Sequence, residues 1–285
     1  MSLPPARPAH KLDLNAAWDQ AVRLIAVNRE VLLVLGGVFF FLPYVLFLLL
    51  VPIPDFAALA GPSGENTAAL TAEVNGFLAE YWWALLLLGL VQSMGALAVM
   101  AVIGDPTRPT VGAAVRRGAT YLLPNLGAQI LTSIAIFVVL FVALLLGRLT
   151  GSQAVAATLS LFALPVVIWV MTRLSLSGPV IAIEQTANPL AALTRSWRLT
   201  GGNGFRLVAF YVLLFAAFFV ISQVLGLIVR VLVALPGAEV AHVLGALLSG
   251  LLYAAMILIG YAVLASVHRL LARAERVSVP STHEV

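Results

Sequence analysis

The chain has 285 residues, of which 62% are hydrophobic and only 10% are charged, and this composition excludes an ordinary soluble domain. It contains no cysteine, so disulfides, thiolate metal sites and cysteine nucleophiles are excluded as well. The formal net charge is +4, but the basic residues lie between long apolar runs, which indicates anionic membrane lipid as the partner and not a nucleic acid.

Six segments are long and apolar enough to cross a membrane as helices, which takes about 20 residues. None of them contains Asp, Glu, Lys or Arg. We therefore predict an all-α, polytopic integral membrane protein with six transmembrane helices in one domain, residues 12–275, between disordered tails at 1–11 and 276–285. The predicted spans are residues 31–51, 82–103, 121–147, 154–172, 207–229 and 243–267.

The basic residues are distributed unevenly over the connecting segments. Fourteen of the sixteen lie in the N-terminal segment, in residues 104–120 and 173–206, and after residue 267. The alternate connections hold only Arg148 and Arg230. Because basic connections are retained in the cytoplasm, this pattern predicts a multi-pass protein of the bacterial inner membrane with both termini cytoplasmic.

Three of the basic segments resemble one another in sequence. Each has an apolar stripe near the helical period with polar residues on the other sides, which predicts an amphipathic helix in the membrane interface. A single register aligns all three, so we predict three repeats of an interfacial helix followed by a transmembrane hairpin. Shifts of 97 and 175 residues superpose Ala16-Ala17 on Ala113-Ala114 and Ala191-Ala192, and Asn28 on Asn125 and Asn203.

The third segment has clear helix boundaries. Asn188 is a good N-cap, Pro189 suits the first turn, and Gly201-Gly202 supplies a stop. Arginines on the second and third predicted interfacial helices can attract anionic headgroups at about 1 kcal/mol per charge, although they could serve only to fix topology. These candidate headgroup contacts are Arg116, Arg117, Arg195 and Arg198.

The spans hold amides and hydroxyls but no ionisable group of the kind that ion-coupled transport uses. Such amides bridge neighbouring helices in most cases, and they could instead line a substrate groove. Pro43 and Pro165 interrupt two spans and predict kinks. The candidate groove residues are Gln92, Asn125, Gln129 and Gln223.

The chain carries no motif of an enzyme, a cofactor site or a metal site. There is no GxSxG, no Walker loop and no GxGxxG after a strand, and the four histidines have no ligand spacing. Glu184 is the only acid between Arg173 and Arg206, and we expect it to pair with a neighbouring arginine. We therefore predict no enzymatic activity, no cofactor and no metal.

The sequence Asn-Pro-Leu-Ala-Ala-Leu-Thr-Arg-Ser-Trp-Arg-Leu-Thr-Gly-Gly over residues 188–202 follows the fourth span and an exit through Arg173, Pro179 and Glu184. It resembles the six-span glycerophosphoryl diester phosphodiesterase membrane domain of bacterial inner-membrane proteins, over nearly all of residues 12–275. In some members this domain precedes a soluble catalytic barrel. The longest basic connection, residues 173–206, cannot hold such a barrel.

Two functions fit these observations. The first is a non-enzymatic membrane protein that organises anionic lipid, or a membrane protein partner, through its basic cytoplasmic rim. The alternative is a transporter or flippase for an amphiphilic, lipid-like substrate, for which a polar cavity should converge on the four amides. If the amides lie in tight helix contacts, the alternative loses its candidate site.

Overall fold

A computed structural model describes residues 12–54, 66–105, 109–233 and 238–277. Their regular structure is entirely helical, and six helices are long and apolar enough to cross a membrane, as predicted. The six candidate spans cover Arg29–Leu50, Thr67–Gly104, Leu122–Leu149, Ala154–Ile183, Gly204–Val229 and Val240–Arg276.

The first candidate span is broken into three pieces: α2 (Arg29–Gly36), the π-helix η1 (Gly37–Phe41) and α3 (Leu42–Leu50). The π-turn ends two residues before Pro43, which has no N–H to donate to the carbonyl four residues earlier, so the backbone widens there. The predicted interruption at Pro43 is thus a π-helical turn.

The other long helices are continuous. The helix α5 (Thr67–Gly104) has 38 residues and α12 (Ala238–Val277) has 40. Between them run α7 (Leu122–Leu149), α8 (Gln153–Leu174), which includes Pro165, and α11 (Gly204–Val233).

Four short helices lie beside the ends of the long ones. Three of them coincide with the predicted amphipathic segments, and the fourth, α9, directly follows α8. They are α1 (Leu14–Val27), α6 (Val111–Thr120), α9 (Ser177–Ile183) and α10 (Pro189–Leu199).

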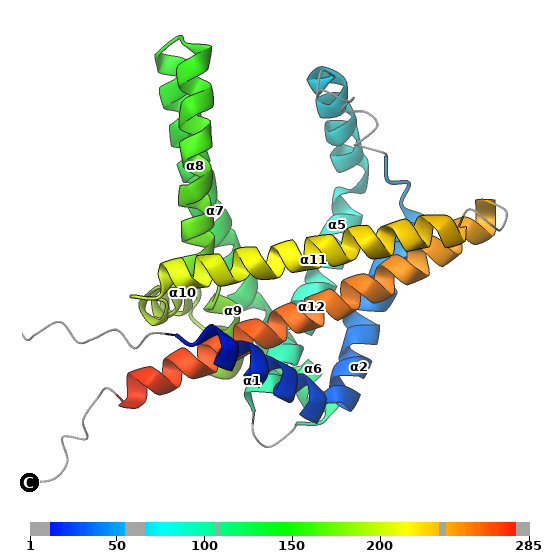
Figure 1. The fold of residues 1–285 in the computed structure, drawn as a ribbon, viewed down its shortest axis with the longest axis vertical. Helices are drawn as coiled ribbons and strands as arrows, with labels where there is room; N and C mark the ends of the chain where they lie inside the picture. The colour runs from blue at the N-terminus through cyan, green and yellow to red at the C-terminus, as the bar shows by residue number, and fades with distance from the viewer. Residues whose placement is uncertain (1–11, 55–65, 106–108, 234–237, 278–285) are drawn as a thin grey trace, which may run out of the picture.

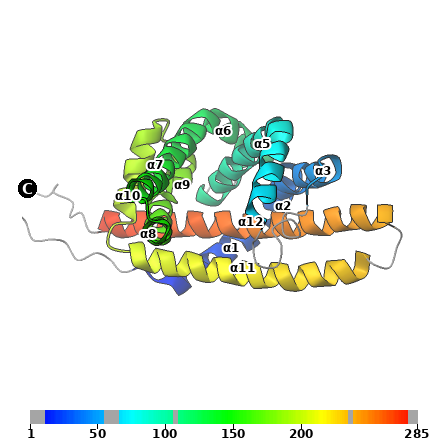
Figure 2. The same ribbon diagram turned by 90° about the horizontal axis from the view of Figure 1, so that it is seen from above.

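The long helices diverge from a shared base, as Figure 1 shows. The α7–α8 hairpin and α5 rise from this base, while the α11–α12 hairpin runs across the molecule. The view from above in Figure 2 places α11 and α12 side by side. In the base, α6 packs on α5, α10 packs on α9, and α1 packs on α12. We call this base, with the last turns of α12, the arginine-rich end.

Three of the short helices, α1, α6 and α10, bury an alanine at equivalent positions against the long helices. Ala17, Ala114 and Ala192 are completely buried. Trp18 on α1 and Trp197 on α10 are both 41% exposed. The small side chains allow close contact with the long helices, while Trp18 and Val22 of α1 and Leu190 and Trp197 of α10 stay exposed.

Glycines permit close approach of the long helices at two sites. A Cβ on Gly95 of α5 would lie 2.4 Å from Cβ of Phe39, and one on Gly250 of α12 would lie 2.4 Å from Cγ2 of Val45. Gly250 and Ala254 have the small-xxx-small spacing that predicts helix contact, and α12 does pack on α3 and η1.

Several helices extend beyond their predicted spans, and α5 and α12 extend furthest. The predicted loop at 52–81 is helical from Thr67, where α5 begins, and residues 55–65 lie outside the described part. At the other end, α12 continues to Val277, two residues into the predicted tail. The remainder of both predicted tails, 1–11 and 278–285, lies outside the described residues.

Candidate functional site

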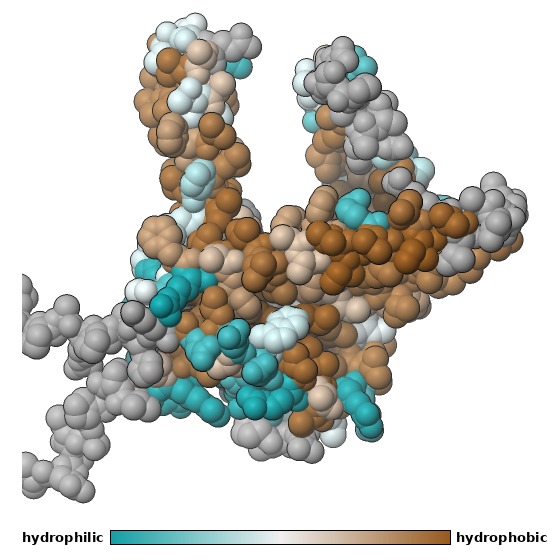
Figure 3. All heavy atoms as spheres, viewed as in Figure 1, coloured by the Kyte–Doolittle hydropathy of each residue, from teal (hydrophilic) through white to brown (hydrophobic). Residues whose placement is uncertain are grey.

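Charged residues gather at the arginine-rich end. Figure 3 shows hydrophilic side chains around this base and hydrophobic ones along α11, α12 and the α7–α8 hairpin. Half of the most apolar stretch of α5 is buried within the molecule, but little or none of the corresponding stretches of α8 and α11 is buried. The candidate functional site therefore lies where the charges are.

The centre of this end is an ion-pair network around Glu184, the residue after α9. Nε of Arg195 on α10 donates to both carboxylate oxygens of Glu184, at 3.3 and 3.2 Å. His268 on α12 lies on the other side, with Nε2 2.9 Å from Oε1 of Glu184. NH1 of Arg195 also donates to Glu275. The predicted pairing of Glu184 with an arginine is confirmed.

These contacts shift the protonation of both partners. The hydrogen bond with His268 lowers the pKa of the Glu184 carboxyl below its ordinary value, burial opposes this, and Arg195 lowers the pKa further. Burial disfavours the charged form of Arg195, but its contacts with Glu184 and Glu275 outweigh burial and raise its pKa. Both groups are therefore held in their charged forms.

The four arginines of the predicted rim have two different environments. Arg195 belongs to the Glu184 network, and NH1 of Arg117 on α6 lies 2.7 Å from Oδ2 of Asp105 at the end of α5. Arg116 on α6 and Arg198 on α10 are exposed. Two of the predicted headgroup contacts thus form ion pairs within the chain, and two face outward.

Residues 188–202 form α10 with Asn188 as the predicted N-cap and the turn that follows the helix. Oδ1 of Asn188 accepts hydrogen bonds from the backbone N–H groups of Leu190 and Ala191, at 2.9 and 3.2 Å. The helix ends at Leu199, and Gly202 adopts a φ of +74° in the turn that follows. The sequence thus identified this helix and its boundaries.

The same helix holds the end of α8 through buried hydroxyls. Oγ of Ser196 donates to the carbonyl oxygen of Arg173 at 2.8 Å and accepts from the N–H of Leu176 at 3.1 Å. Oγ1 of Thr200 donates to the same carbonyl at 3.3 Å. The guanidinium of Arg173 lies over Trp197 at 4.5 Å from the ring centroid. Arg173 therefore has a packing role, which sequence analysis did not assign.

A cavity of about 550 Å³ opens beside the Glu184 network. Its walls come from the last turns of α12, from the end of α5 and from the α9–α10 region. Four arginines line it, together with Glu184 and His268. We call it the α12 pocket; its lining residues are Gly104, Ile183, Glu184, Arg195, His268, Arg269, Ala272, Arg273 and Arg276.

The four amides of the predicted groove have different environments. The hydroxyl of Tyr253 on α12 donates to Oε1 of Gln92 on α5 at 2.8 Å, and Nε2 of Gln129 on α7 donates to Oγ of Ser93 at 3.3 Å. Asn125 is buried and Gln223 on α11 is exposed. Gln92 and Gln129 therefore bridge helices, the structural role that was weighed against a substrate groove.

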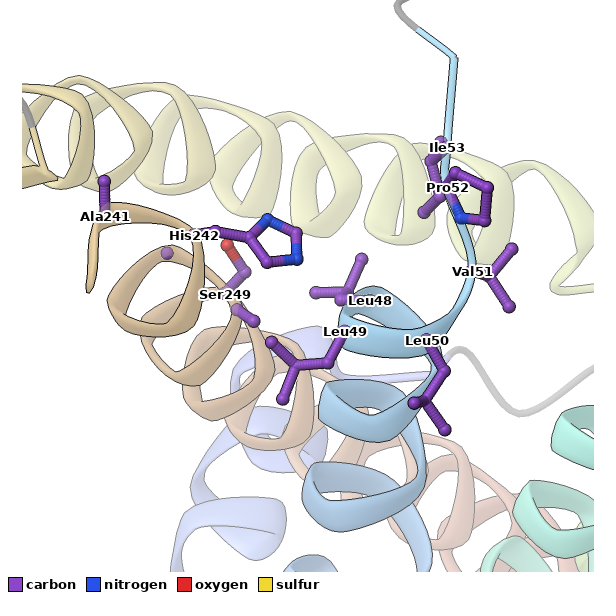
Figure 4. Close-up of a pocket in the computed structure, with 11 residues that line it drawn as sticks. Leu48, Leu49, Leu50, Val51, Pro52, Ile53, Ala241, His242 and Ser249 are labelled. Atoms are coloured by element: carbon purple, nitrogen blue, oxygen red, sulfur yellow. The ribbon is translucent and has the colours of Figure 1, made fainter. Parts of the chain in front are cut away.

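Further cavities lie away from the arginine-rich end, and one of about 400 Å³ on α7 is lined by Gln129 and Ser133 among apolar residues. One of about 560 Å³ lies between the end of α3 and the start of α12, where the imidazole of His242 points toward Leu48 (Figure 4). Another, of about 820 Å³, lies between α8, α11 and α12 and is almost wholly apolar. Among the described residues, no three His, Asp or Glu side chains group to hold a metal ion.

The α12 pocket is not apparent from the sequence alone. One signal was present, because Arg269, Arg273 and Arg276 have the spacing of four and three residues that places side chains on one face of a helix. This spacing indicates a shared face only if α12 continues as a helix through these residues. The contribution of Glu184 and Ile183 from another part of the chain left no local signal.

Comparison with known proteins gives no relative: no family model, no curated protein and no solved structure matches the chain.

Proposed function

We propose that this protein is a non-enzymatic, multi-pass protein of the bacterial inner membrane that organises anionic lipid through a basic cytoplasmic rim. The observation that carries the proposal is the outward-facing pair Arg116 and Arg198, on two short helices at the end of the molecule where hydrophilic side chains gather (Figure 3). The half-exposed rings of Trp18 and Trp197 lie on short helices of the same end, and such rings suit the headgroup region.

The proposal includes a threefold repeat of an interfacial helix and a hairpin, and membership of the glycerophosphoryl diester phosphodiesterase membrane-domain family. Burial at equivalent positions supports the repeat. The second alanine of each aligned pair is completely buried, and the residue four positions later is buried as well. The three aligned asparagines, Asn28, Asn125 and Asn203, are buried too.

Lipid preference tests the rim directly. The full chain is reconstituted in bilayers of mixed phosphatidylglycerol and phosphatidylcholine, and the lipid bound at its surface is measured with spin-labelled lipids. Replacing Arg116 and Arg198 with Gln is expected to lower the preference for phosphatidylglycerol by about fivefold per arginine, because each is worth about 1 kcal/mol. Raising the salt concentration should reduce the wild-type preference toward that of the variant.

The matched control is Arg148→Gln, an exposed arginine where α7 ends, at the far end of that hairpin. This variant loses one charge and should keep the preference for phosphatidylglycerol. An equal loss in the control and in the rim variant, or no loss in either, would contradict the proposal.

Orientation is tested separately in intact cells. Tags placed at the N-terminus and the C-terminus should both resist an added protease and become sensitive only after the inner membrane is opened. A tag that is cleaved from the periplasmic side would overturn the orientation that places the rim in the cytoplasm.

The alternative, transport of an amphiphile, is favoured by one observation, the apolar cavity between α8, α11 and α12. A Cβ on Gly260, which lines it, would meet no atom within 4 Å, so a large side chain can enter the cavity. Transport through this cavity predicts that Gly260→Phe slows transbilayer movement of fluorescent phosphatidylglycerol. Gly226→Phe on α11, where space is also open, is the control and should not slow it.

A further inference from the structure

Three arginines of α12 lack a counter-charge within the described chain. Arg269, Arg273 and Arg276 lie on one face of the helix, where like charges four residues apart repel one another. NH1 of Arg269 donates to the carbonyl oxygen of Ile103 at 2.8 Å, and Nε of Arg276 donates to that of Ala272 at 3.4 Å. Among the described residues, none of the three takes part in an ion pair.

The acids nearest to these arginines are already bound. Glu184 is held between Arg195 and His268, and Glu275 is paired with Arg195. This network neutralises the acidic wall of the α12 pocket and leaves the arginines of α12 in excess. The pocket therefore offers guanidinium donors to an incoming anion.

The chemistry of the donors limits the ligand to an oxyanion. Guanidinium groups present planar, paired N–H donors that match phosphate and carboxylate oxygens. A volume of about 550 Å³ lies within the range of roughly 300–1,000 Å³ that small-molecule sites occupy. Gly104, Ile183 and Ala272 add an apolar wall that can contact the organic part of such a ligand.

We propose that the α12 pocket is a binding site for a phosphate ester, gripped by Arg273 and Arg276 with Arg269 behind them. The phosphate belongs either to the headgroup of an anionic phospholipid or to a soluble phosphate ester. The pocket shares Arg195 with the predicted rim, but its donors on α12 are distinct from the outward-facing Arg116 and Arg198, and it does not require that those two bind lipid.

Binding to the purified full chain in a nonionic detergent tests the site with three probes. Short-chain phosphatidylglycerol carries the phosphate with an acyl part, dioctanoylglycerol is its phosphate-free counterpart, and inorganic phosphate is the free anion. We expect saturable binding of the first and none of the second. Competition by inorganic phosphate identifies a soluble ester as an acceptable ligand, and its absence assigns the site to a lipid headgroup.

The decisive variant is Arg273→Gln with Arg276→Gln. It should weaken binding by at least about tenfold, the change expected when a hydrogen bond to a charged group is lost. Lysine at both positions keeps the charge without the paired donors and should restore binding only in part. The matched control, Arg23→Gln with Arg29→Gln, removes two exposed charges from α1 and α2 and should bind as wild type.

Two results would overturn the proposal. One is equal weakening in the pocket variant and in the control, which would make the effect one of overall charge. The other is wild-type binding of phosphatidylglycerol that is no tighter than that of dioctanoylglycerol. The variant Arg116→Gln with Arg198→Gln separates this site from the rim, because it should leave binding to the α12 pocket unchanged. Thermal unfolding of each variant checks that it is folded.

Discussion

Nε2 of His268 lies 2.9 Å from Oε1 of Glu184, although the two residues are 84 positions apart. The contact joins α12 to the segment that follows α9 and places Glu184 where Arg195 also reaches it. His268 is almost completely buried and the Glu184 side chain is 28% exposed, so the contact lies at the edge of the packed base. It links the stability of this end of the molecule to pH.

The first prediction concerns the contribution of Glu184 to thermal stability at acidic pH. The folded pKa of Glu184 is below its ordinary value, so the carboxylate stabilises the fold above that value, and this contribution is lost as the pH falls through the folded pKa. Glu184→Gln should therefore lower the melting temperature most at neutral pH, and the difference from wild type should shrink as the pH falls below about 4.5.

Melting curves in detergent from neutral to acidic pH measure this difference. Glu73→Gln, at an exposed position on α5, is the control and should differ from wild type by a constant amount. A difference for Glu184→Gln that grows with acidity would show that the carboxylate does not stabilise the folded state.

The second prediction uses two glycines of α6. A Cβ on Gly118 would lie 2.6 Å from the carbonyl oxygen of Met94, so Gly118→Ala should push α6 away from α5 and cost about 1–3 kcal/mol. A Cβ on Gly112 would meet no atom within 4 Å. Gly112→Ala should be neutral or stabilising by up to about 1 kcal/mol, because alanine favours the helix. Equal melting temperatures for the two variants would refute this packing.

The third prediction concerns the buried hydroxyl of Ser196. Ser196→Ala leaves the N–H of Leu176 without its acceptor and should destabilise the protein by about 1–3 kcal/mol. The control is Ser160→Ala on α8, whose exposed hydroxyl donates to the carbonyl of Ala156 in its own helix. If both variants melt at the wild-type temperature, α10 does not hold α8 through this residue.

The fourth prediction separates helix packing from a substrate groove. Gln92 and Tyr253 form a hydrogen bond between α5 and α12, so a double-mutant cycle of Gln92→Leu and Tyr253→Phe should give a coupling of about 0.6 kcal/mol, and below about 1.7. The control cycle pairs Gln223→Leu, an exposed position, with Tyr253→Phe and should give none. Absence of coupling in the first cycle would reopen a groove at Gln92.

The elements whose signals are local could be predicted from the sequence. The six spans follow from the length of the apolar runs, since a helix must satisfy its backbone within itself wherever water is absent. The start of α10 follows from Asn188, because a side-chain oxygen there binds N–H groups only two and three residues away. Each of these features depends on residues close together in the chain.

Only the tertiary structure shows which side chains are buried, which arginines form ion pairs and where the pocket lies, because these depend on contacts between segments far apart in the chain. The sequence of α1 does not indicate that Ala17 packs inward while Trp18 stays half-exposed, because burial depends on α12. Arg195 is on an amphipathic helix like Arg198, but the positions of Glu184 and Glu275 draw it into a network. The α12 pocket exists because three separate segments meet at one end of the bundle, and no local pattern of residues encodes that meeting.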